Sequence, residues 1–270
     1  MRLFYKYIKP KAERLVNYAW KMQRLTSQRG EYIFIASLPK SGSTFMAKAM
    51  SHLTGYRYYD LAYAYERNDQ NLYLPKLIDV YSQGSVTHQH LRATGPNVEL
   101  LNMFSIRPVI MTRNIFDTVV SIRDHMFKEG YAFPTFYCNE SFAELDEHSQ
   151  FDQIIELGIP WYFNFYVSWF EATRNHHIDA LWMNYEDVVQ DWDKALAKLA
   201  DFYGIEKTPE EIATALQQTR EMKRTKTRLN KGVAGRGESA LTTAQKDRIR
   251  SMARFYPWVD FSAIGIVRTD

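Results

Sequence analysis

Residues 39–44 read Pro-Lys-Ser-Gly-Ser-Thr and place a cation, a glycine and three hydroxyl groups side by side. An apolar run rich in β-forming residues, 32–36, precedes this segment, and a helical pattern that stops at Gly55 follows it. The first N–H groups of a helix have no intrahelical acceptors, and the helix dipole favours negative charge beside them. The segment therefore predicts a loop that binds a phosphate-like anion at the start of a helix.

Each polar residue of this loop is expected to contribute to anion binding. Glycine lets the backbone approach the anion, the lysine ammonium can reach its leaving oxygen, and the hydroxyls add donors. The expected anion ligands are Lys40, Ser41, Gly42, Ser43 and Thr44. The order differs from the nucleotide-kinase motif G-x-x-x-x-G-K-[ST], because here the lysine precedes the glycine and the upstream glycine is missing.

Two more polar residues follow a later strand. Arg113 comes directly after the apolar run 108–112, and Ser121 lies eight residues further on, in the predicted helix 114–129. An arginine at a strand tip can bind a phosphate through two parallel hydrogen bonds. Ser121 lies two turns into the helix on the side that faces back, so the pair predicts a second anion site.

His88 and His90 are the candidate bases. Both fall in the predicted strand 85–91, where alternation places their side chains on the same face. An imidazole with a pKa near 6.5 suits removal of a proton from a hydroxyl group at neutral pH. One histidine of the pair is then expected to be structural. The adjacent His176 and His177 would diverge on a helix and are not expected to bind a metal.

Strands that alternate with helices must position these residues, which predicts an α/β domain with a central parallel sheet flanked by helices. The predicted strands are 32–36, 85–91, 108–112 and 180–184. Further predicted helices are 191–203, one that Thr208 and Glu211 open with a capping box, and one from Thr242 to near Pro257. Residues 221–241 have no periodicity and predict a long basic loop.

Composition excludes several classes of protein. The chain has 270 residues, of which 46% are hydrophobic and 24% charged, so it is not largely disordered. The single cysteine, Cys138, excludes an intramolecular disulfide and a cysteine-based zinc site. No apolar run approaches the ~20 residues of a membrane span, and the N-terminus lacks the apolar core of a signal peptide. The expected compartment is therefore cytoplasmic.

The net charge of +3 hides an uneven distribution. Residues 1–30 and residues 220–250 each carry a net charge of +7, which leaves −11 for the rest of the chain. Residues 10–27 predict an amphipathic helix with a basic face, which could pack on the domain edge or lie on a membrane surface. The chain is thus divided into a basic N-terminal helical segment, 1–30, and an α/β domain, 31–270.

The order P-K-S-G-[ST]-T after the first strand resembles the PAPS-dependent sulfotransferases, whose loop reads P-K-S-G-T-T-W. Ser43 keeps the hydroxyl, and Phe45 keeps an aromatic ring that could stack on adenine. The resemblance implies a P-loop-NTPase-like sulfotransferase fold. It also implies that the cosubstrate is 3′-phosphoadenylyl sulfate (PAPS), that the product is 3′-phosphoadenosine 5′-phosphate (PAP), and that no metal takes part.

Other segments extend the resemblance over roughly residues 31–255. The family binds the 3′-phosphate with an arginine and a serine at the separation of Arg113 and Ser121. A Y-E-D segment implies that Tyr185 closes on the nucleotide, and an adenine-side segment implies the same for Thr219. The basic loop resembles R-K-G-x-x-G-D-W, but Asn230 replaces its arginine and Arg236-Gly237 its last two residues. The phosphate contacts implied there are Lys231, Gly232 and either Arg228 or Arg236.

The family's K-T-H-L-P segment distinguishes the two histidines. The register favours His90 as the base, because it precedes Leu91 and lies 23 residues before Arg113, while His88 takes the lysine position. The predicted reaction is in-line attack of an acceptor hydroxyl on the sulfur of PAPS. Lys40 and the N–H groups of residues 41–44 would neutralise the charge on the departing phosphate.

The acceptor follows only loosely from the sequence. Aromatic-rich stretches at 56–65, 131–137 and 161–170 could line an apolar pocket, although core packing is favoured for the last one. A phenol, an alcohol, a lipid or a sugar hydroxyl would fit, and no nucleic acid partner is expected. The rival readings are a nucleotide kinase, which needs Mg²⁺ carboxylates, and a non-enzymatic protein that binds membranes or polyanions through its basic segments.

Overall fold

The computed structural model describes residues 31–63, 69–131, 133–222 and 235–267. Five parallel strands form one sheet in the order β2-β3-β1-β4-β5, which confirms the predicted α/β fold with a central parallel sheet flanked by helices. The strands are β1 (Tyr32–Ser37), β2 (Arg57–Tyr58), β3 (Ser85–Gln89), β4 (Pro108–Thr112) and β5 (Leu181–Asn184).

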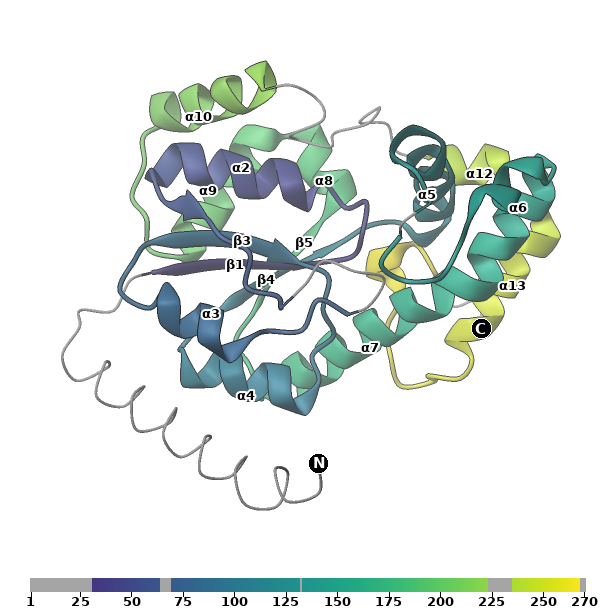
Figure 1. Ribbon diagram of the computed structural model, residues 1–270, viewed down its shortest axis with the longest axis horizontal. Helices are drawn as coiled ribbons and strands as arrows, with labels where there is room; N and C mark the ends of the chain where they lie inside the picture. The colour runs from purple at the N-terminus through teal and green to yellow at the C-terminus, as the bar shows by residue number, and fades with distance from the viewer. Residues whose placement is uncertain (1–30, 64–68, 132, 223–234, 268–270) are drawn as a thin grey trace.

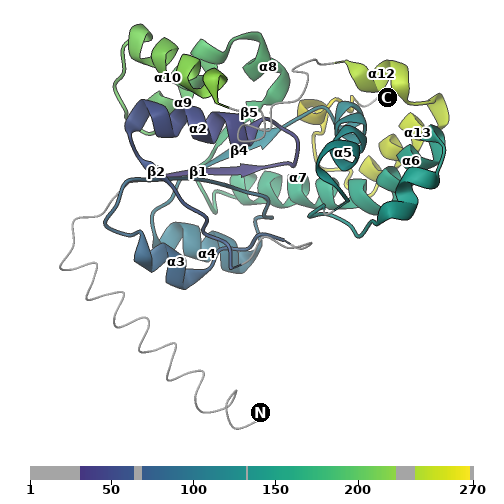
Figure 2. The same cartoon turned by 45° about the horizontal axis from the view of Figure 1, so that its top comes forward.

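Helices cover both faces of this sheet and extend past its carboxyl edge (Figures 1 and 2). Helices α2, α9 and α10 lie on one face, α3, α4 and α7 on the other, and α5, α6, α12 and α13 beside the sheet. The helices are α2 (Ser43–Thr54), α3 (Leu74–Asp79), α4 (Gly95–Met103), α5 (Ile115–Glu129), α6 (Glu147–Gln153), α7 (Ile159–Arg174), α8 (Tyr185–Gln190), α9 (Trp192–Phe202), α10 (Pro209–Glu221), α12 (Arg236–Ala240) and α13 (Thr243–Ala253), and shorter turns are η2 (Glu140–Glu144), η3 (Ile154–Gly158) and η4 (Ser262–Ile264).

Strand β1 lies at the centre of the sheet and divides the core in two. Tyr32 and Phe34 point into the cluster with α3, α4 and α7, whereas Ile33 and Ile35 point into the cluster with α2, α9 and α10. This alternation is that of a strand buried on both faces. Because β1 is fixed by β3 on one side and β4 on the other, the loop that follows it starts from a rigid position.

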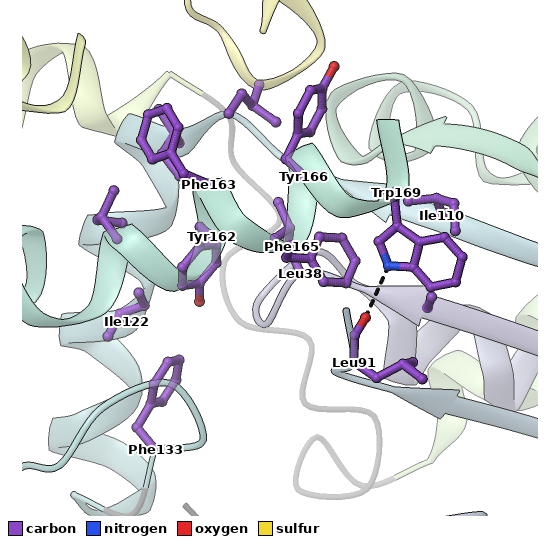
Figure 3. Packing of buried hydrophobic residues seen from close by; sticks show 14 of the residues in the cluster. Leu38, Leu91, Ile110, Ile122, Phe133, Tyr162, Phe163, Phe165, Tyr166 and Trp169 are labelled. Atoms are coloured by element: carbon purple, nitrogen blue, oxygen red, sulfur yellow. Dashed lines mark hydrogen bonds between the residues drawn. The ribbon is translucent and has the colours of Figure 1, made fainter. Parts of the chain in front are cut away.

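The aromatic stretch 161–170 forms the buried side of α7 (Figure 3). Tyr162, Phe165 and Trp169 are fully buried. The indole Nε1 of Trp169 donates to the Leu91 carbonyl oxygen at 3.0 Å, so the helix is tied to the segment after β3. This confirms the packing interpretation of the stretch, because these side chains fill the core.

Most predicted elements are present, and the differences are corrections. Strand β3 ends at Gln89 and not at residue 91, so His90 is the first residue after the strand. Residues 221–241 are not all loop, because α12 occupies 236–240. The last helix ends at Ala253 and not near Pro257. Strand β2 and helices α3, α4, α6 and α8 were not predicted, since they are short or weakly amphipathic.

Thr208 and Glu211 do form the predicted capping box. The predicted helix 10–27 and the segment 1–30 lie outside the described residues. Among the helices that are described, none is long and apolar enough to cross a membrane.

Candidate functional site

The loop between β1 and α2 presents the start of α2 without a cap. Gly42 precedes α2 with a φ of 79°, and α2 has neither a side-chain cap nor an acidic residue in its first turn. Helices α5, α8, α9, α10 and α13, by contrast, have side chains that accept from their first N–H groups. No side chain among the described residues therefore occupies the N–H groups at the start of α2, which is what an anion site requires, and anion binding there stays a prediction.

Hydroxyl groups hold the loop in shape. Ser41 is buried, and its Oγ donates to the Leu38 carbonyl oxygen at 2.7 Å, so this hydroxyl closes the turn. Ser37 Oγ donates to Ser43 Oγ at 2.9 Å, which leaves the Ser43 proton available as a donor. Thr44 Oγ1 lies 3.2 Å from His88 Nε2. The serine hydroxyls thus stabilise the conformation of the loop at least as much as they supply hydrogen-bond donors for an anion.

Both the backbone and the ammonium group of Lys40 have defined contacts. Its backbone adopts the left-handed region with a φ of 72°, which costs a residue with a Cβ about 1–2 kcal/mol. Its carbonyl oxygen accepts from Arg113 Nη1 at 2.7 Å, and its Nζ lies 3.4 Å from His125 Nδ1 on α5. The ammonium therefore points away from the sheet and toward α5.

Tyr185 and Trp192 form an aromatic wall beside Gly42. A Cβ built on Gly42 would lie 3.1 Å from two ring carbons of Tyr185 and 3.8 Å from Trp192 Cη2. Phe45, the residue expected to stack on adenine, is buried and packs on Trp192 with ring centroids 4.4 Å apart. Trp192 was missed by sequence reasoning, because its place depends on how α9 packs on α2.

Arg113 joins the loop to the second predicted anion site. Its Nη1 donates to the Lys40 carbonyl oxygen and to Ser121 Oγ, the latter at 3.3 Å. Its guanidinium carbon lies 4.3 Å from the centre of the Tyr185 ring. The side chain is only 5% exposed, and its Nε has no hydrogen-bond partner. Among the described residues it takes part in no ion pair. A buried cation in this state is costly until an anion joins it.

A carboxylate on α5 holds the far end of the basic loop. Asp117 is buried and accepts from the backbone N–H groups of Gly235 at 2.6 Å and Gly237 at 2.7 Å. Arg236, one of the two candidates for the missing loop arginine, pairs with Asp124 at 2.8 Å. The structure therefore brings residues 235–237 against the helix that carries Ser121. Asp117 was missed, because nothing in its local sequence shows that a distant loop needs an anchor.

Several predicted contacts stand apart from this arrangement. Arg228, Lys231 and Gly232 lie outside the described residues. Thr219 is fully buried near the end of α10, and its Oγ1 donates to the Ala215 carbonyl oxygen at 2.7 Å within the same helix. A contact between Thr219 and a nucleotide stays a prediction.

His90 has a defined tautomer. Its Nδ1 lies 2.9 Å from the Ser37 carbonyl oxygen and 3.2 Å from Ser37 Oγ; because a carbonyl can only accept, the shorter contact assigns the proton to Nδ1. Nε2 then carries the lone pair that a general base needs. The His90 backbone is fixed too, since its N–H donates to Gln70 Oε1 at 2.7 Å and its carbonyl accepts from Gln70 N at 3.1 Å.

His88 has a different environment on the same side of β3. Its ring lies 6.0 Å from that of His90, as strand alternation predicted. Its Nε2 faces Thr44 Oγ1, and its Nδ1 lies 3.0 Å from Tyr58 OH, so hydroxyls contact both ring nitrogens. The Lys48 ammonium lies 4.1 Å from the centre of the Tyr58 ring. His88 thus links the start of α2 to β2.

Burial shifts several pKa values around Arg113. Burial raises the pKa of Tyr162 well above its ordinary value, so its hydroxyl stays protonated and donates to the Pro39 carbonyl oxygen at 3.3 Å. Burial also raises the pKa of Tyr185, against the opposing effect of the Arg113 charge. It raises the pKa of Glu186, whose Oε1 accepts from Asn114 N and whose buried Oε2 has no partner.

The described residues contain no group of three or more His, Cys, Asp or Glu side chains that could hold a metal ion. The donors that meet at the carboxyl edge of the sheet are instead N–H groups, hydroxyls, an ammonium and a guanidinium. Such a donor set suits an anion better than a cation.

The family model of the sulfotransferase domain matches residues 31–253, so this chain belongs to the sulfotransferase domain family and is an enzyme of that class. A search of curated protein sequences found no significant match.

Solved structures share the fold at low sequence identity. The mouse sulfotransferase SULT7A1 complexed with PAP superposes with a TM-score of 0.60 at 17% identity, covering 86% of each chain. Retinol dehydratase with androsterone and PAP gives a TM-score of 0.57 at 15% identity, covering 84% of this chain and 81% of that one. Retinol dehydratase with retinol and PAP also gives 0.57 at 15% identity, covering 93% and 88%. These likenesses confirm the sulfotransferase fold.

Proposed function

We propose that this protein transfers a sulfuryl group from PAPS to a hydroxyl group of an acceptor and releases PAP and a sulfate ester. PAPS supplies the activated sulfuryl group. The protein supplies the cradle for both ends of the nucleotide and a base for the acceptor proton. The structures of SULT7A1 and retinol dehydratase contain PAP, which supports this choice of cosubstrate.

The observation that carries the proposal is the state of Arg113. This buried cation has an unpartnered Nε, contacts Ser121, and donates to the backbone of the phosphate loop. A nucleotide with only a 5′-phosphate would leave the second anion site empty, whereas PAPS also carries a 3′-phosphate that could bind there. The guanidinium would bind the 3′-phosphate, while the uncapped start of α2 would bind the 5′ side.

Lys40 and His90 are proposed to act on the reacting groups. The Lys40 ammonium and the N–H groups at the start of α2 would neutralise negative charge on the departing 5′-phosphate. Nε2 of His90 would take the acceptor proton, because Nδ1 already donates to the Ser37 carbonyl. The contact of Nδ1 with the Ser37 carbonyl, which directs Nε2 to act as the acceptor, supports His90 as the base.

The acceptor is proposed to be a small molecule with a hydroxyl group: a phenol, an alcohol, a lipid or a sugar. Retinol and androsterone occur in the retinol dehydratase structures, and both carry a hydroxyl on an apolar skeleton. The fully buried Phe133 and the partly buried Tyr131, next to α5, are candidates for the apolar wall of an acceptor site. The cytoplasm stays the proposed compartment, and segment 1–30 stays the candidate for peripheral membrane contact.

Two measurements test the proposal. Calorimetric titrations should show that PAP binds at least about tenfold more tightly than adenosine 5′-monophosphate, which lacks the 3′-phosphate, because Arg113 loses its charged partner. ATP in the presence of Mg²⁺ should bind no better than the monophosphate, whereas a kinase would prefer it. A panel of acceptors incubated with PAPS should then yield a product heavier by one sulfuryl group. Equal affinity for PAP and adenosine 5′-monophosphate would refute the assignment of the 3′-phosphate site.

A further inference from the structure

His125 is a partly buried histidine that the proposed reaction does not use. It lies on α5, four residues after Ser121, and its side chain is 10% exposed. Its Nδ1 faces two charged groups, with Lys40 Nζ at 3.4 Å and Glu129 Oε1 at 3.3 Å. The edge of its ring meets Phe133 at a centroid distance of 5.4 Å.

One ring nitrogen cannot satisfy both charged groups at once. To bond the Lys40 ammonium, Nδ1 must be unprotonated and accept; to bond the Glu129 carboxylate, it must be protonated and donate. The two contacts therefore belong to two tautomers of the ring, with the proton on Nε2 in the first and on Nδ1 in the second. Exchange between them releases one proton to water and takes up another, so the net charge does not change.

The Lys40 side chain is long and flexible, so a contact at its ammonium strongly affects where this charge lies. Its backbone is fixed by its left-handed conformation and by Arg113, but four rotatable bonds separate the backbone from the ammonium. The His125 contact fixes the far end. An ammonium placed in this way is pre-oriented for a leaving oxygen and loses less conformational freedom when an anion binds.

We propose that His125 is a positioning residue for Lys40, which it holds through Nδ1 in the empty enzyme and releases by donating the Nδ1 proton to Glu129 when the nucleotide draws the ammonium away. This inference rests on the proposed function, since it assumes that Lys40 moves to the 5′-phosphate of the nucleotide. Two charged groups from different elements face the ring, Lys40 from the phosphate loop and Glu129 from α5.

The direct test is ¹⁵N NMR of the His125 ring in the full-length protein. In the empty enzyme, Nδ1 should give the signal of an unprotonated nitrogen. Saturation with PAP should convert it to a protonated nitrogen, because Glu129 becomes its partner. Lys40→Met should cause the same change with no nucleotide present. The exposed His177 gives the control signal, which should not change in either case.

Kinetics give a second readout. His125→Phe keeps an aromatic ring against Phe133 but removes Nδ1, and should lower kcat by about tenfold with little change in KM for PAPS, because the ammonium is misplaced. His125→Asn keeps an acceptor near the Nδ1 position and should restore most of kcat. His177→Phe is the matched control and should behave as wild type.

The outcomes separate this inference from the function on which it rests. If PAP does not bind, the proposed function fails, and the empty Lys40→Met protein still decides whether His125 responds to Lys40. If PAP binds and the Nδ1 signal stays the same in both arms, His125 does not hold Lys40 and the inference is overturned. Equal loss of kcat in the Phe and Asn variants would also overturn it, because that pattern indicates a packing role.

Discussion

The loop before α2 and the residues around Arg113 are proposed to bind anions in two different ways. The loop is built from six consecutive residues, 39–44, and uses backbone N–H groups whose direction is set by one helix. The pocket is assembled from the tip of β4, from α5 and from Tyr185 on α8, and it uses one guanidinium. Contacts through Lys40 join them, since its carbonyl accepts from Arg113.

This difference suggests a division of labour. Lys40 and His90 are proposed to act on the reacting atoms. Lys40 belongs to the loop and is fixed by Arg113, and the His90 ring contacts the Ser37 carbonyl at the end of β1. The Arg113 guanidinium offers a strong charge that is proposed to bind the 3′-phosphate, which suits recognition of the nucleotide and not the chemical step. Changes near the loop should then affect kcat, and changes in the pocket should affect binding.

The largest effect is expected for His90→Ala. Removing a general base lowers turnover by about 10²- to 10⁴-fold, whereas the PAP affinity should stay within about twofold, because His90 faces the acceptor side. Steady-state kinetics and a calorimetric titration with PAP measure the two quantities. His148→Ala, at an exposed position on α6, is the control. A variant that retains turnover would show that the base is wrongly assigned.

Arg113→Met should give the opposite pattern. Loss of a charge-assisted contact to phosphate costs about 1.5–3 kcal/mol, which corresponds to PAP binding that is roughly 10- to 150-fold weaker. Arg107, before the other end of β4, is half exposed and pairs with Asp179, so Arg107→Met is a matched control that should leave PAP affinity unchanged. If the two variants bind PAP equally well, the pocket is not a phosphate site and the comparison fails.

Alanine substitutions at the two glycines that flank α2 distinguish the energetic cost of a strained backbone from an effect on the geometry of the site. Gly42 and Gly55 both have left-handed φ values, 79° and 73°, so an alanine at either position should lower the free energy of unfolding by about 1 kcal/mol. A Cβ on Gly42 would press on Tyr185, whereas a Cβ on Gly55 meets nothing within 4 Å. Only Gly42→Ala should therefore weaken PAP binding. Chemical denaturation and titration give both numbers, and equal PAP affinities would contradict the role of Gly42.

The sequence predicts the loop well and the pocket only in part, for a physical reason. Residues 39–44 act through local backbone geometry, so their order alone indicates an anion site. Strands β1 and β4 and helix α5 were likewise visible as periodic patterns.

Other features depend on contacts between distant segments. Trp192 reaches the loop only because α9 packs on α2, and Asp117 accepts from Gly235 and Gly237 more than a hundred residues away. The pairing of His125 with Lys40 is of the same kind, with a sequence separation of 85. No local pattern marks such residues, because each looks like an ordinary member of its own helix.

The smallest effect concerns Glu186, which lies beside Asn114 at the rim of the Arg113 pocket. Burial raises the pKa of its carboxyl above the ordinary 4.5, although the Asn114 N–H and the Arg113 charge favour the ionised form. The unfolded chain ionises at the ordinary pKa. The wild type therefore loses stability as the pH rises from about 4.5 through the folded-state pKa, where the buried carboxyl resists losing its proton.

Glu186→Gln has the shape of the protonated acid but cannot ionise. At pH 7 its melting temperature should exceed that of the wild type by about 1–2 °C, and this difference should disappear below pH 4.5, where both side chains are neutral. Asp187→Asn, at the adjacent exposed position, should show no such pH dependence. Loss of a negative charge near Arg113 should also make PAP binding slightly tighter, which only a carboxylate at the pocket can explain. A melting difference that does not change with pH would show that Glu186 is ionised at no cost.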